Sequence, residues 1–207
     1  MPRTIAVIGG TGAEGFGLAS RFAQAGAAVH IGSRDLQRAQ AAAARIPRAQ
    51  GLLNADAARN AEIVLLTVPL AAQIPTLAAL CESFRPGAIL VDTTVSLQAT
   101  PPAGSSAQQA AQNVPEGVAV VAAFHTLSAK LLAQLDRPVD SDVLLCGDSA
   151  DAKAAVVELV GLLPGARAVD AGPLSNARLL ENLAALLILL NRRYKVKEAG
   201  VRITGLP

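Results

Sequence analysis

The feature that most constrains this chain is a glycine-rich turn directly after a short apolar segment. Residues 4–8 read Thr-Ile-Ala-Val-Ile, and Gly10, Gly12 and Gly15 then meet the spacing G-x-G-x-x-G. In a strand–turn–helix unit the first glycine permits a tight turn, the second lets the backbone approach a pyrophosphate, and the third lets the helix pack closely on the strand. The spacing therefore predicts a dinucleotide site. The alternative is an ordinary glycine-rich turn between a strand and a helix.

Beyond this turn, short apolar runs alternate with alanine-rich or amphipathic stretches. That alternation predicts an α/β fold, a Rossmann-like doubly wound, mostly parallel sheet with helices on both faces. We expect strands at residues 4–8, 28–32, 63–68, 88–92, 118–124, 143–146 and 167–170, and helices at residues 14–25, 36–45, 70–84, 105–112, 150–162 and 175–197. With 207 residues, 52% of them hydrophobic and 16% charged, the chain is long and apolar enough for one sizeable core.

The end of the second predicted strand carries the residues that discriminate between dinucleotides. There the sequence reads Gly32-Ser33-Arg34-Asp35, with Arg38 four residues after Arg34. An NAD site would place a carboxylate here, whereas Ser33 and Arg34 can donate to a 2′-phosphate and Arg38 can add a second cation. We therefore predict NADP. Asp35 could instead hold a ribose or cap the following helix, and the cap is preferred; for the two arginines the alternative is a solvated helix start.

The strand–helix alternation stops after Gly172-Pro173. The sequence thus predicts two parts, an NADP-binding Rossmann domain over residues 1–172 and a small helical segment over residues 173–207 that completes the coenzyme site. The apolar helix around Leu179 to Leu190 would expose a large surface if solitary, so we expect a homodimer that packs there. Residues 98–117, rich in Pro, Gly, Ala and Gln, are expected to form a surface excursion.

Two strand ends and one histidine supply further candidates for a site. Thr67-Val68-Pro69 closes the strand predicted at residues 63–68, and residues 91–95, which end in Val95, close the strand predicted at residues 88–92. Either segment could line a ribose or nicotinamide outside the carboxyl ends of the strands. His125 follows the strand at 118–124 and could relay a proton. Because no Lys, Tyr or second His accompanies it, a positional or backbone role is preferred, and no catalytic residue is assigned with certainty.

Composition argues against several other classes of protein. The net charge is only +2 with 2% aromatic residues and no Trp, which does not favour nucleic acid as a partner. The apolar run from Leu183 to Leu190 is shorter than the roughly 20 residues that span a bilayer, and residues 1–8 do not have the pattern of a secretory leader, so we do not expect secretion. Cys81 and Cys146 are expected to be buried, reduced thiols of a cytoplasmic protein, and the two His and two Cys show no metal-ligand spacing.

Five separated stretches together carry a resemblance that covers nearly the whole chain. They are Gly9-Gly10-Thr11-Gly12, Gly32-Ser33-Arg34, Phe124-His125-Thr126, Cys146-Gly147-Asp148 and the stretch from Val169 to Arg178 that contains Asp170-Ala171-Gly172-Pro173-Leu174. This combination resembles the coenzyme F420:NADP oxidoreductases, also described as NADPH-dependent F420 reductases. The Asp-Ala-Gly-Pro-Leu stretch is more specific than the glycine turn, which many dehydrogenases share.

The resemblance implies reversible hydride transfer between NADP(H) and the 5-deazaflavin coenzyme F420, two small-molecule partners held face to face. It implies that NADP is held around the glycine turn and the second strand end, by Thr11, Ala13, Glu14, Ser33, Arg34 and Arg38. Val68, Val95 and Ala129 would lie on the nicotinamide side, and His125, Thr126, Leu127 and the region of Ala199 would face the deazaflavin. Two interpretations stay open beside it: an NADPH-dependent flavin or ferric-chelate reductase, and a non-catalytic NADP-binding sensor.

Overall fold

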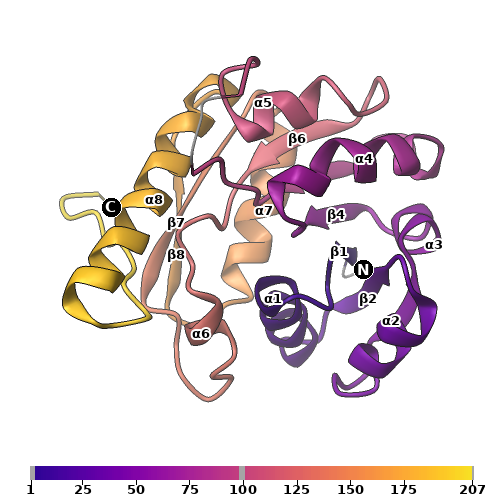
Figure 1. Ribbon diagram of the computed structural model, residues 1–207, viewed down its shortest axis with the longest axis horizontal. Coiled ribbons are helices and arrows are strands. Elements are labelled where there is room, and N and C mark those ends of the chain that lie inside the picture. Colours follow the sequence, from indigo (N-terminus) through magenta and orange to yellow (C-terminus); the bar gives the residue numbers. More distant parts are fainter. Residues whose placement is uncertain (1–2, 98–100, 207) are drawn as a thin grey trace.

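The computed structural model describes residues 3–97 and 101–206, and within them the chain forms a single eight-stranded sheet flanked by helices (Figure 1). The strand order is β3-β2-β1-β4-β5-β6-β7-β8, and every neighbouring pair is parallel except β6 and β7. The predicted mostly parallel, doubly wound α/β fold is therefore confirmed. The strands are β1 (Thr4–Ile8), β2 (Ala28–Ser33), β3 (Gln50–Leu53), β4 (Ile63–Leu66), β5 (Ile89–Asp92), β6 (Ala119–Ala122), β7 (Ser141–Gly147) and β8 (Ala166–Asp170).

Helices cover both faces of this sheet. The faces are defined by two separate hydrophobic clusters, one under α1, α2, α6 and α7 and the other under α3, α4, α5 and α8. The helices are α1 (Ala13–Gln24), α2 (Leu36–Ala43), α3 (Asn54–Arg59), α4 (Leu70–Leu80), α5 (Ser106–Ala111), α6 (Ala129–Leu132), α7 (Ala150–Gly161) and α8 (Ala177–Tyr194). In the described parts of the chain, no helix is long and apolar enough to cross a membrane.

The period-two geometry of a strand explains why the central strands are apolar throughout. In β1, Ile5 and Val7 join the first cluster while Ala6 and Ile8 join the second. Successive side chains point to opposite faces, so a strand covered by helices on both sides needs a continuous apolar run rather than an alternating one. That is the sequence signal by which the central strands were predicted.

The structure differs from the sequence prediction in several short elements. Strand β3, helix α3 and helix α6 were not predicted. Strand β3 has no fully buried residue, and α3 and α6 are too short to show a helical period of apolar residues. The segment predicted as a surface excursion is partly core: Ser106, Ala107 and Ala110 of α5 are fully buried, while residues 98–100 lie outside the described part of the chain. The prediction that both thiols are buried is wrong for Cys81, which is exposed, and holds for Cys146.

The antiparallel junction between β6 and β7 is fixed by a buried arginine from another element. Arg21 of α1 is 3% exposed and donates four hydrogen bonds of 2.6 to 3.0 Å. The acceptors are backbone carbonyls at and after the end of α6, where a helix leaves its last carbonyls without intrahelical partners. They belong to Leu131, Leu132, Gln134 and Arg137. Helix α1 thus holds the connection that leads from β6 to β7.

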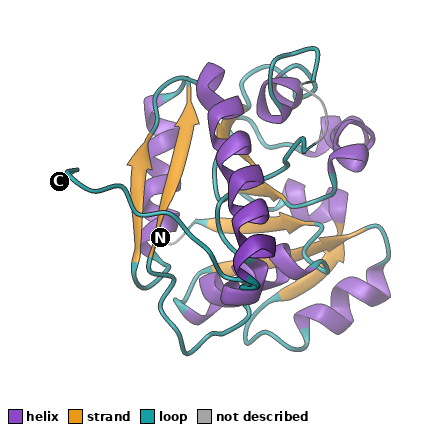
Figure 2. Ribbon diagram, turned by 60° about the vertical axis from the view of Figure 1, so that its left-hand side comes forward, coloured by secondary structure: helices purple, strands orange, loops and turns teal. Residues whose placement is uncertain are grey.

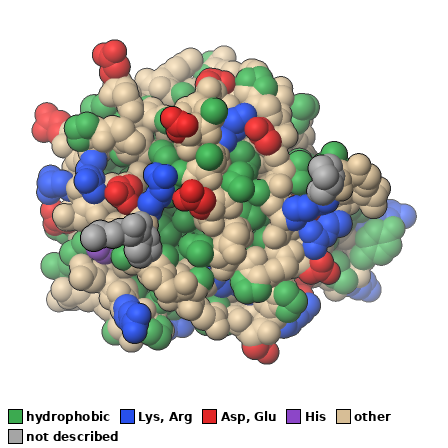
Figure 3. Space-filling model, turned by 180° about the vertical axis from the view of Figure 1, so that it is seen from behind, with side chains coloured by type: hydrophobic (Ala, Val, Ile, Leu, Met, Phe, Trp, Pro, Cys, Tyr) green, Lys and Arg blue, Asp and Glu red, His purple; other side chains and the backbone are tan. Residues whose placement is uncertain are grey.

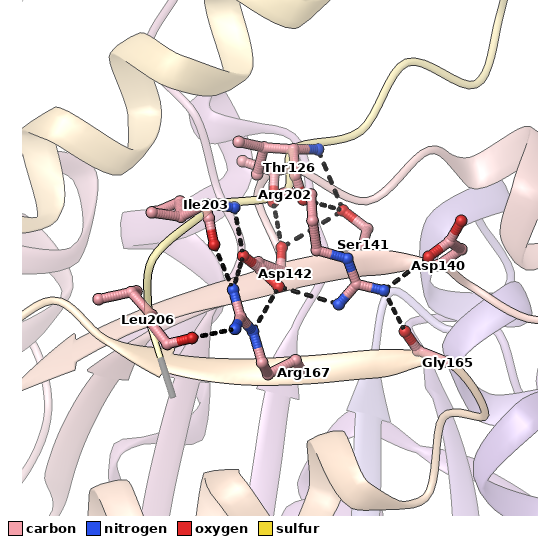
Figure 4. A network of polar contacts seen from close by, with 10 residues as sticks. Thr126, Asp140, Ser141, Asp142, Gly165, Arg167, Arg202, Ile203 and Leu206 are labelled. Atoms are coloured by element: carbon pink, nitrogen blue, oxygen red, sulfur yellow. Dashed lines mark hydrogen bonds and ion pairs between the residues drawn. The ribbon is translucent and has the colours of Figure 1, made fainter.

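The C-terminal chain is held to the sheet by one buried carboxylate. It leaves α8 and crosses the β7–β8 pair (Figure 2), where Asp142 accepts hydrogen bonds from Arg167, Arg202 and the N–H of Ile203 at 2.7 to 3.1 Å (Figure 4). These hydrogen bonds, chiefly those from the Arg167 guanidinium, hold the pKa of the buried Asp142 well below its usual range. The tail is therefore attached by an ionised aspartate.

Asp142→Asn tests this attachment. A carboxyl whose pKa is depressed by folding stabilises the folded state above its unfolded pKa of about 3.9 and loses that contribution as pH falls through the folded pKa. At neutral pH the variant lacks the full contribution, so we expect the Ile203 amide to exchange with deuterium about tenfold faster or more. The matched control is Asp140→Asn, because Asp140 also pairs with Arg202 but its side chain is 82% exposed. Equal exchange rates in both variants would contradict the assignment.

Candidate functional site

The glycine turn joins β1 to α1, but the left-handed backbone falls at Gly9, with φ of +84°, rather than at Gly10, the glycine predicted to permit the tight turn. Gly12 caps α1 in an extended conformation. Gly15 is required for close approach, since a Cβ there would overlap the hydroxyl oxygen of Thr67. That hydroxyl donates to the carbonyl of Ile8 at 2.9 Å, so β1, β4 and α1 meet at one point. The N-terminus of α1 is thereby left open to an anion.

A cavity of about 380 Å³ lies beside this turn, at the carboxyl ends of β1, β2 and β4. The reversal of strand order between β1 and β4 is where open α/β sheets bind ligands. The cavity brings together many of the predicted cofactor residues: Thr11, Gly12, Ser33, Arg34, Arg38, Thr67, Val68 and Pro69. Asn54, Ala72 and Thr76 also line it and were not predicted, because they come from the start of α3 and from α4 rather than from a recognised motif.

The end of β2 has the chemistry expected for a phosphate rather than a ribose hydroxyl. Asp35 accepts a hydrogen bond from the backbone N–H of Arg38 at 3.2 Å and so caps α2, which is the role preferred from the sequence. Its other oxygen lies 3.8 Å from the Arg38 guanidinium, in an exposed pair that contributes little to stability. Ser33 is buried and Arg34 exposed, and both line the cavity.

Behind the site lies a buried polar network that the sequence analysis missed. Asp92, fully buried at the end of β5, accepts hydrogen bonds from Gln73 of α4 at 3.1 Å and from the Thr94 hydroxyl at 2.9 Å. Burial raises the pKa of Asp92 to about 7, against the lowering effect of Gln73 and Thr94, and the nearby Glu181 raises it further. The carboxyl is therefore part protonated near neutral pH, which lowers the cost of enclosing it.

Glu181 extends this network to the last helix. It is fully buried on α8 and accepts hydrogen bonds from the N–H of Ser106 at 2.6 Å and from Arg178 at 3.2 Å. The sequence could have indicated this burial, because Ala177, Glu181 and Ala184 lie at helical spacing on the apolar side of the helix. An acidic residue on that side needs a hydrogen-bonding partner. The pairing places α8 against α5, over the carboxyl end of β5.

Glu14, predicted as a cofactor residue, lies between the glycine turn and this network. It retains some exposed surface, yet its carboxyl lies among packed atoms beside the Thr93 hydroxyl and near Asp92. Burial raises the pKa of Glu14 to about 7, the Thr93 contact opposes the shift, and the charge of Asp92 adds to it. Ala13, the residue before it, is exposed at the start of α1.

His125 is placed by a strained residue at the end of β6. Phe124 has φ of +67°, a left-handed conformation that bulky residues rarely adopt, and is held there by complete burial and an edge contact with Phe22. The imidazole of His125 lies near the Thr94 backbone, and burial lowers its pKa to about 4. The ring is therefore neutral at neutral pH, which fits the preferred positional role better than that of a cationic acid.

The remaining predicted residues lie in the β6–β7 connection and the tail. Ser128 donates to the Lys197 carbonyl at 2.6 Å, which brings the tail against the start of α6 at Ala129. The N–H of Ala199 donates to Asn191 of α8 at 3.0 Å. Thr126 and Leu127 are buried, and none of His125, Thr126, Leu127, Ala129, Ala199 or Val95 lines the cavity beside the glycine turn. The predicted site therefore has two parts that the fold places separately.

These features define a class of protein. A doubly wound sheet, a glycine turn opening a helix N-terminus, and a cavity with Ser33 and Arg34 at its far end are the parts of a dinucleotide-dependent oxidoreductase. The donor set, a hydroxyl and guanidinium groups, fits a phosphate monoester such as the one that distinguishes NADP from NAD.

Comparison with known proteins identifies the family. A family model described as NADP oxidoreductase, coenzyme F420-dependent, matches residues 4–96. An F420-dependent NADP reductase from Methanothermobacter thermautotrophicus is 42% identical over 100% of this chain and 97% of its own length, and one from Methanocaldococcus jannaschii is 38% identical over 98% of each. The chain belongs to this family of F420-dependent NADP oxidoreductases, which confirms the resemblance inferred from its motifs.

A solved structure agrees with this assignment. A protein from Arthrobacter sp. FB24, provisionally described as an F420-dependent NADP reductase, superposes with a TM-score of 0.84 at 28% identity, covering 98% of this chain and 99% of its own. The similarity extends through the β7–β8 pair, α8 and the tail, beyond the segment that the family model matches.

Arg34→Ala tests the phosphate end of the cavity. Loss of a charged donor to a 2′-phosphate is expected to weaken NADP binding by about 1.5–3 kcal/mol and to leave NAD binding nearly unchanged. Titration calorimetry with both nucleotides measures this. Arg59→Ala is the control, because Arg59 is exposed on α3 and pairs with Asp56 rather than lining the cavity. Equal losses for NADP and NAD would refute the role of Arg34.

Proposed function

We propose that this protein catalyses reversible hydride transfer between NADP(H) and the 5-deazaflavin coenzyme F420. The observation that carries the proposal is the full-length similarity to F420-dependent NADP reductases, combined with a cavity whose far end holds Ser33 and Arg34. When bound, the two coenzymes supply the hydride donor and acceptor carbons. The chain itself then has to bind, orient and shield two flat rings.

The residues divide these tasks in the way the resemblance implies. The turn at Gly10 to Gly15 holds the pyrophosphate, Ser33, Arg34 and Arg38 hold the 2′-phosphate, and Thr67, Val68 and Pro69 line the path between them. Val95, His125, Thr126, Leu127, Ala129 and Ala199 form the second half, where small or neutral side chains leave room for stacked rings. The neutral imidazole of His125 adds no charge there.

Anaerobic mixing with reduced F420 tests the reaction. The purified protein is combined with reduced F420 and either NADP or NAD, and the deazaflavin absorbance is followed. Rapid reoxidation with NADP alone is expected, because the 2′-phosphate supplies binding energy that NAD lacks. NADP binding without turnover would instead favour another flavin or ferric acceptor, or a sensor.

We also propose that residues 1–172 form the NADP-binding domain and residues 173–207 a segment that completes the coenzyme site. The buried Glu181 and the Asp142 attachment support the role of the segment, since Glu181 ties α8 to α5 and Asp142 ties the tail to β7. A cytoplasmic location is supported by two free cysteines, one of them exposed. On the face in Figure 3, acidic and basic side chains are interspersed, in keeping with small-molecule partners.

A homodimer formed through α8 is the assembly that we propose. One side of this helix leaves large apolar side chains open to solvent: Leu179 is 65%, Leu186 49% and Leu189 60% exposed. A second copy of the same helix, related by a two-fold axis, would cover them with matching residues.

Leu189→Asp tests the dimer. The charge is expected to be incompatible with an apolar two-fold interface, so light scattering at micromolar concentration should report a dimer for the wild type and a monomer for the variant. Leu135→Asp, which changes an equally apolar, 42% exposed residue in the β6–β7 connection, should stay dimeric. A monomeric wild-type protein would contradict the proposal.

A further inference from the structure

The end of α8 and the chain after it carry a concentration of basic side chains. Residues 182–207 contain five basic residues and one acidic residue, Glu198. Of these, Arg202 and Glu198 are each held in ion pairs with other parts of the chain. The remaining basic residues are exposed, and within the part of the chain that the structure describes none of them forms an ion pair. They are Arg192, Arg193, Lys195 and Lys197.

Three of these cations line a groove of about 520 Å³ at the end of α8. The helix ends in a Schellman motif, in which Lys195 has a left-handed φ of +55° and the N–H of Val196 donates to the Asn191 carbonyl at 3.0 Å. The chain turns back at this point (Figure 1), so the residues after the helix face its last turn. The groove is lined by Ile188, Asn191, Arg192, Lys195, Val196 and Lys197.

The helix end alone does not account for these cations. A left-handed residue after a helix is usually glycine, because a Cβ there crowds the backbone, yet Lys195 occupies that position. The helix dipole favours basic side chains in the last turn, but its effect fades within that turn. Lys197 lies three residues beyond Tyr194, the last residue of α8. The charge in the groove therefore calls for a ligand.

The groove adjoins the second half of the proposed site. Asn191, which lines the groove, accepts a hydrogen bond from the N–H of Ala199 at 3.0 Å. The Lys197 carbonyl accepts one from Ser128 at 2.6 Å, and Ser128 lies in the connection that leaves the carboxyl end of β6. Ala199 and the residues around Ser128 are those proposed to face the deazaflavin. A coenzyme bound there has the groove directly beside it.

The groove and the proposed dimer contact lie on different sides of α8. Each residue of a helix is rotated by about 100° from the one before it. Ile188 and Asn191 are thereby turned roughly 100° or more away from Leu186 and Leu189. A second copy packed on those leucines does not need to cover the groove.

The coenzyme proposed as second substrate is anionic along its tail. Its ring is joined through a ribityl chain and a phosphodiester to an oligoglutamyl tail, in which each further glutamate adds a carboxylate. Cations spread along an open groove match such a flexible chain better than a single phosphate, which is usually held by a convergent, bidentate donor set. The exposed Ile188 and Val196 can pack against the methylene groups of the glutamyl units.

We propose that this groove binds the oligoglutamyl tail of the deazaflavin coenzyme, with Arg192, Lys195 and Lys197 as the cations. The tail lies outside the reacting centre, so the groove contributes to the affinity for the coenzyme and to the choice among tail lengths. It takes no part in hydride transfer itself. The inference rests on the proposed function, which names F420 as the second substrate, and deepens it by assigning a site to the part of the coenzyme that does not react.

Affinity for the coenzyme should therefore depend on the glutamates. Wild-type protein is expected to bind F420 with a tail of about five glutamates roughly tenfold more tightly than the same compound without glutamates, since several exposed ion pairs each contribute a few-fold. This advantage should disappear between about 0.1 M and about 1 M salt, where the Debye length falls from about 10 Å to about 3 Å. Quenching of the deazaflavin fluorescence measures the affinity. NADP⁺ is present throughout, so both coenzymes are oxidised and no turnover occurs.

The double variant Lys195→Gly, Lys197→Gln tests the residues. Glycine suits the left-handed position of Lys195, and the contact of Lys197 with Ser128 is made by its backbone carbonyl, so both changes preserve the path of the tail. The variant is expected to bind long-tailed F420 about three- to tenfold more weakly than the wild type. Its affinity for the compound without glutamates should be unchanged.

The matched control is the double variant Arg48→Gly, Arg85→Gln. Arg48 is also a basic residue with a left-handed φ, of +63°, and Arg85 is exposed as Lys197 is. Both lie in connections that lead into the amino ends of β3 and β5, at the edge of the sheet opposite to the site. The control removes the same charge and should keep the preference for long tails.

Three results would overturn the inference: equal affinity of the wild type for both compounds, an equal loss for both compounds in the Lys195 and Lys197 variant, or a loss of tail preference in the control. The salt dependence of the wild type supplies a test that requires no variant. Equal affinities with normal hydride transfer to NADP would remove the role of the groove and leave the proposed function standing. If neither compound binds, the proposed function fails and the inference fails with it.

Discussion

Arg21 is the side chain on which the placement of the two halves of the site depends. Arg21 belongs to α1, the helix whose first turn forms the pyrophosphate end of the site. Its guanidinium donates hydrogen bonds to backbone carbonyls of the β6–β7 connection, which also contains residues 125–129. A planar guanidinium with five donors can satisfy several carbonyls at once, which a lysine cannot. Helix α1 thus sets the position of both parts, and the distance between them is fixed inside the core rather than at the surface.

Sequence analysis predicted the strands and helices whose burial produces a recognisable pattern of apolar residues. The seven predicted strands all form. The central ones are continuous apolar runs because helices cover both of their faces, whereas the edge strand β8 has no fully buried residue and was predicted from the glycines and polar residues that bound it. Strand β3, at the other edge, has four residues, none of them fully buried, and was missed. The last helix ends at Tyr194 rather than residue 197 because Lys195 turns to a left-handed φ of +55°. Such endings depend on local backbone geometry that hydrophobic periodicity does not encode.

The site residues likewise divide into those that local sequence predicts and those that depend on the packing of distant elements. Gly12, Ser33 and Arg34 were found because a turn and a strand end bring them together through the backbone alone. Asp92 and Glu181 were missed because their partners, Gln73 and Ser106, come from helices distant in sequence. An acidic residue on the apolar side of a helix was the available signal. The tertiary network that enclosed carboxyls need is visible only once the helices are packed.

The reversal of direction at β7 has a consequence for how this molecule is held together. Strands β6 and β7 are paired at only two positions, Val121 with Gly147 and Ala122 with Cys146. Strand β7, by contrast, is joined to β8 at five positions. The sheet therefore has a narrow seam at which strand pairing contributes little. The β7–β8 pair and α8 keep their place beside the nucleotide half through side chains instead, namely Arg21 on the β6–β7 connection and Glu181 on the N–H of Ser106.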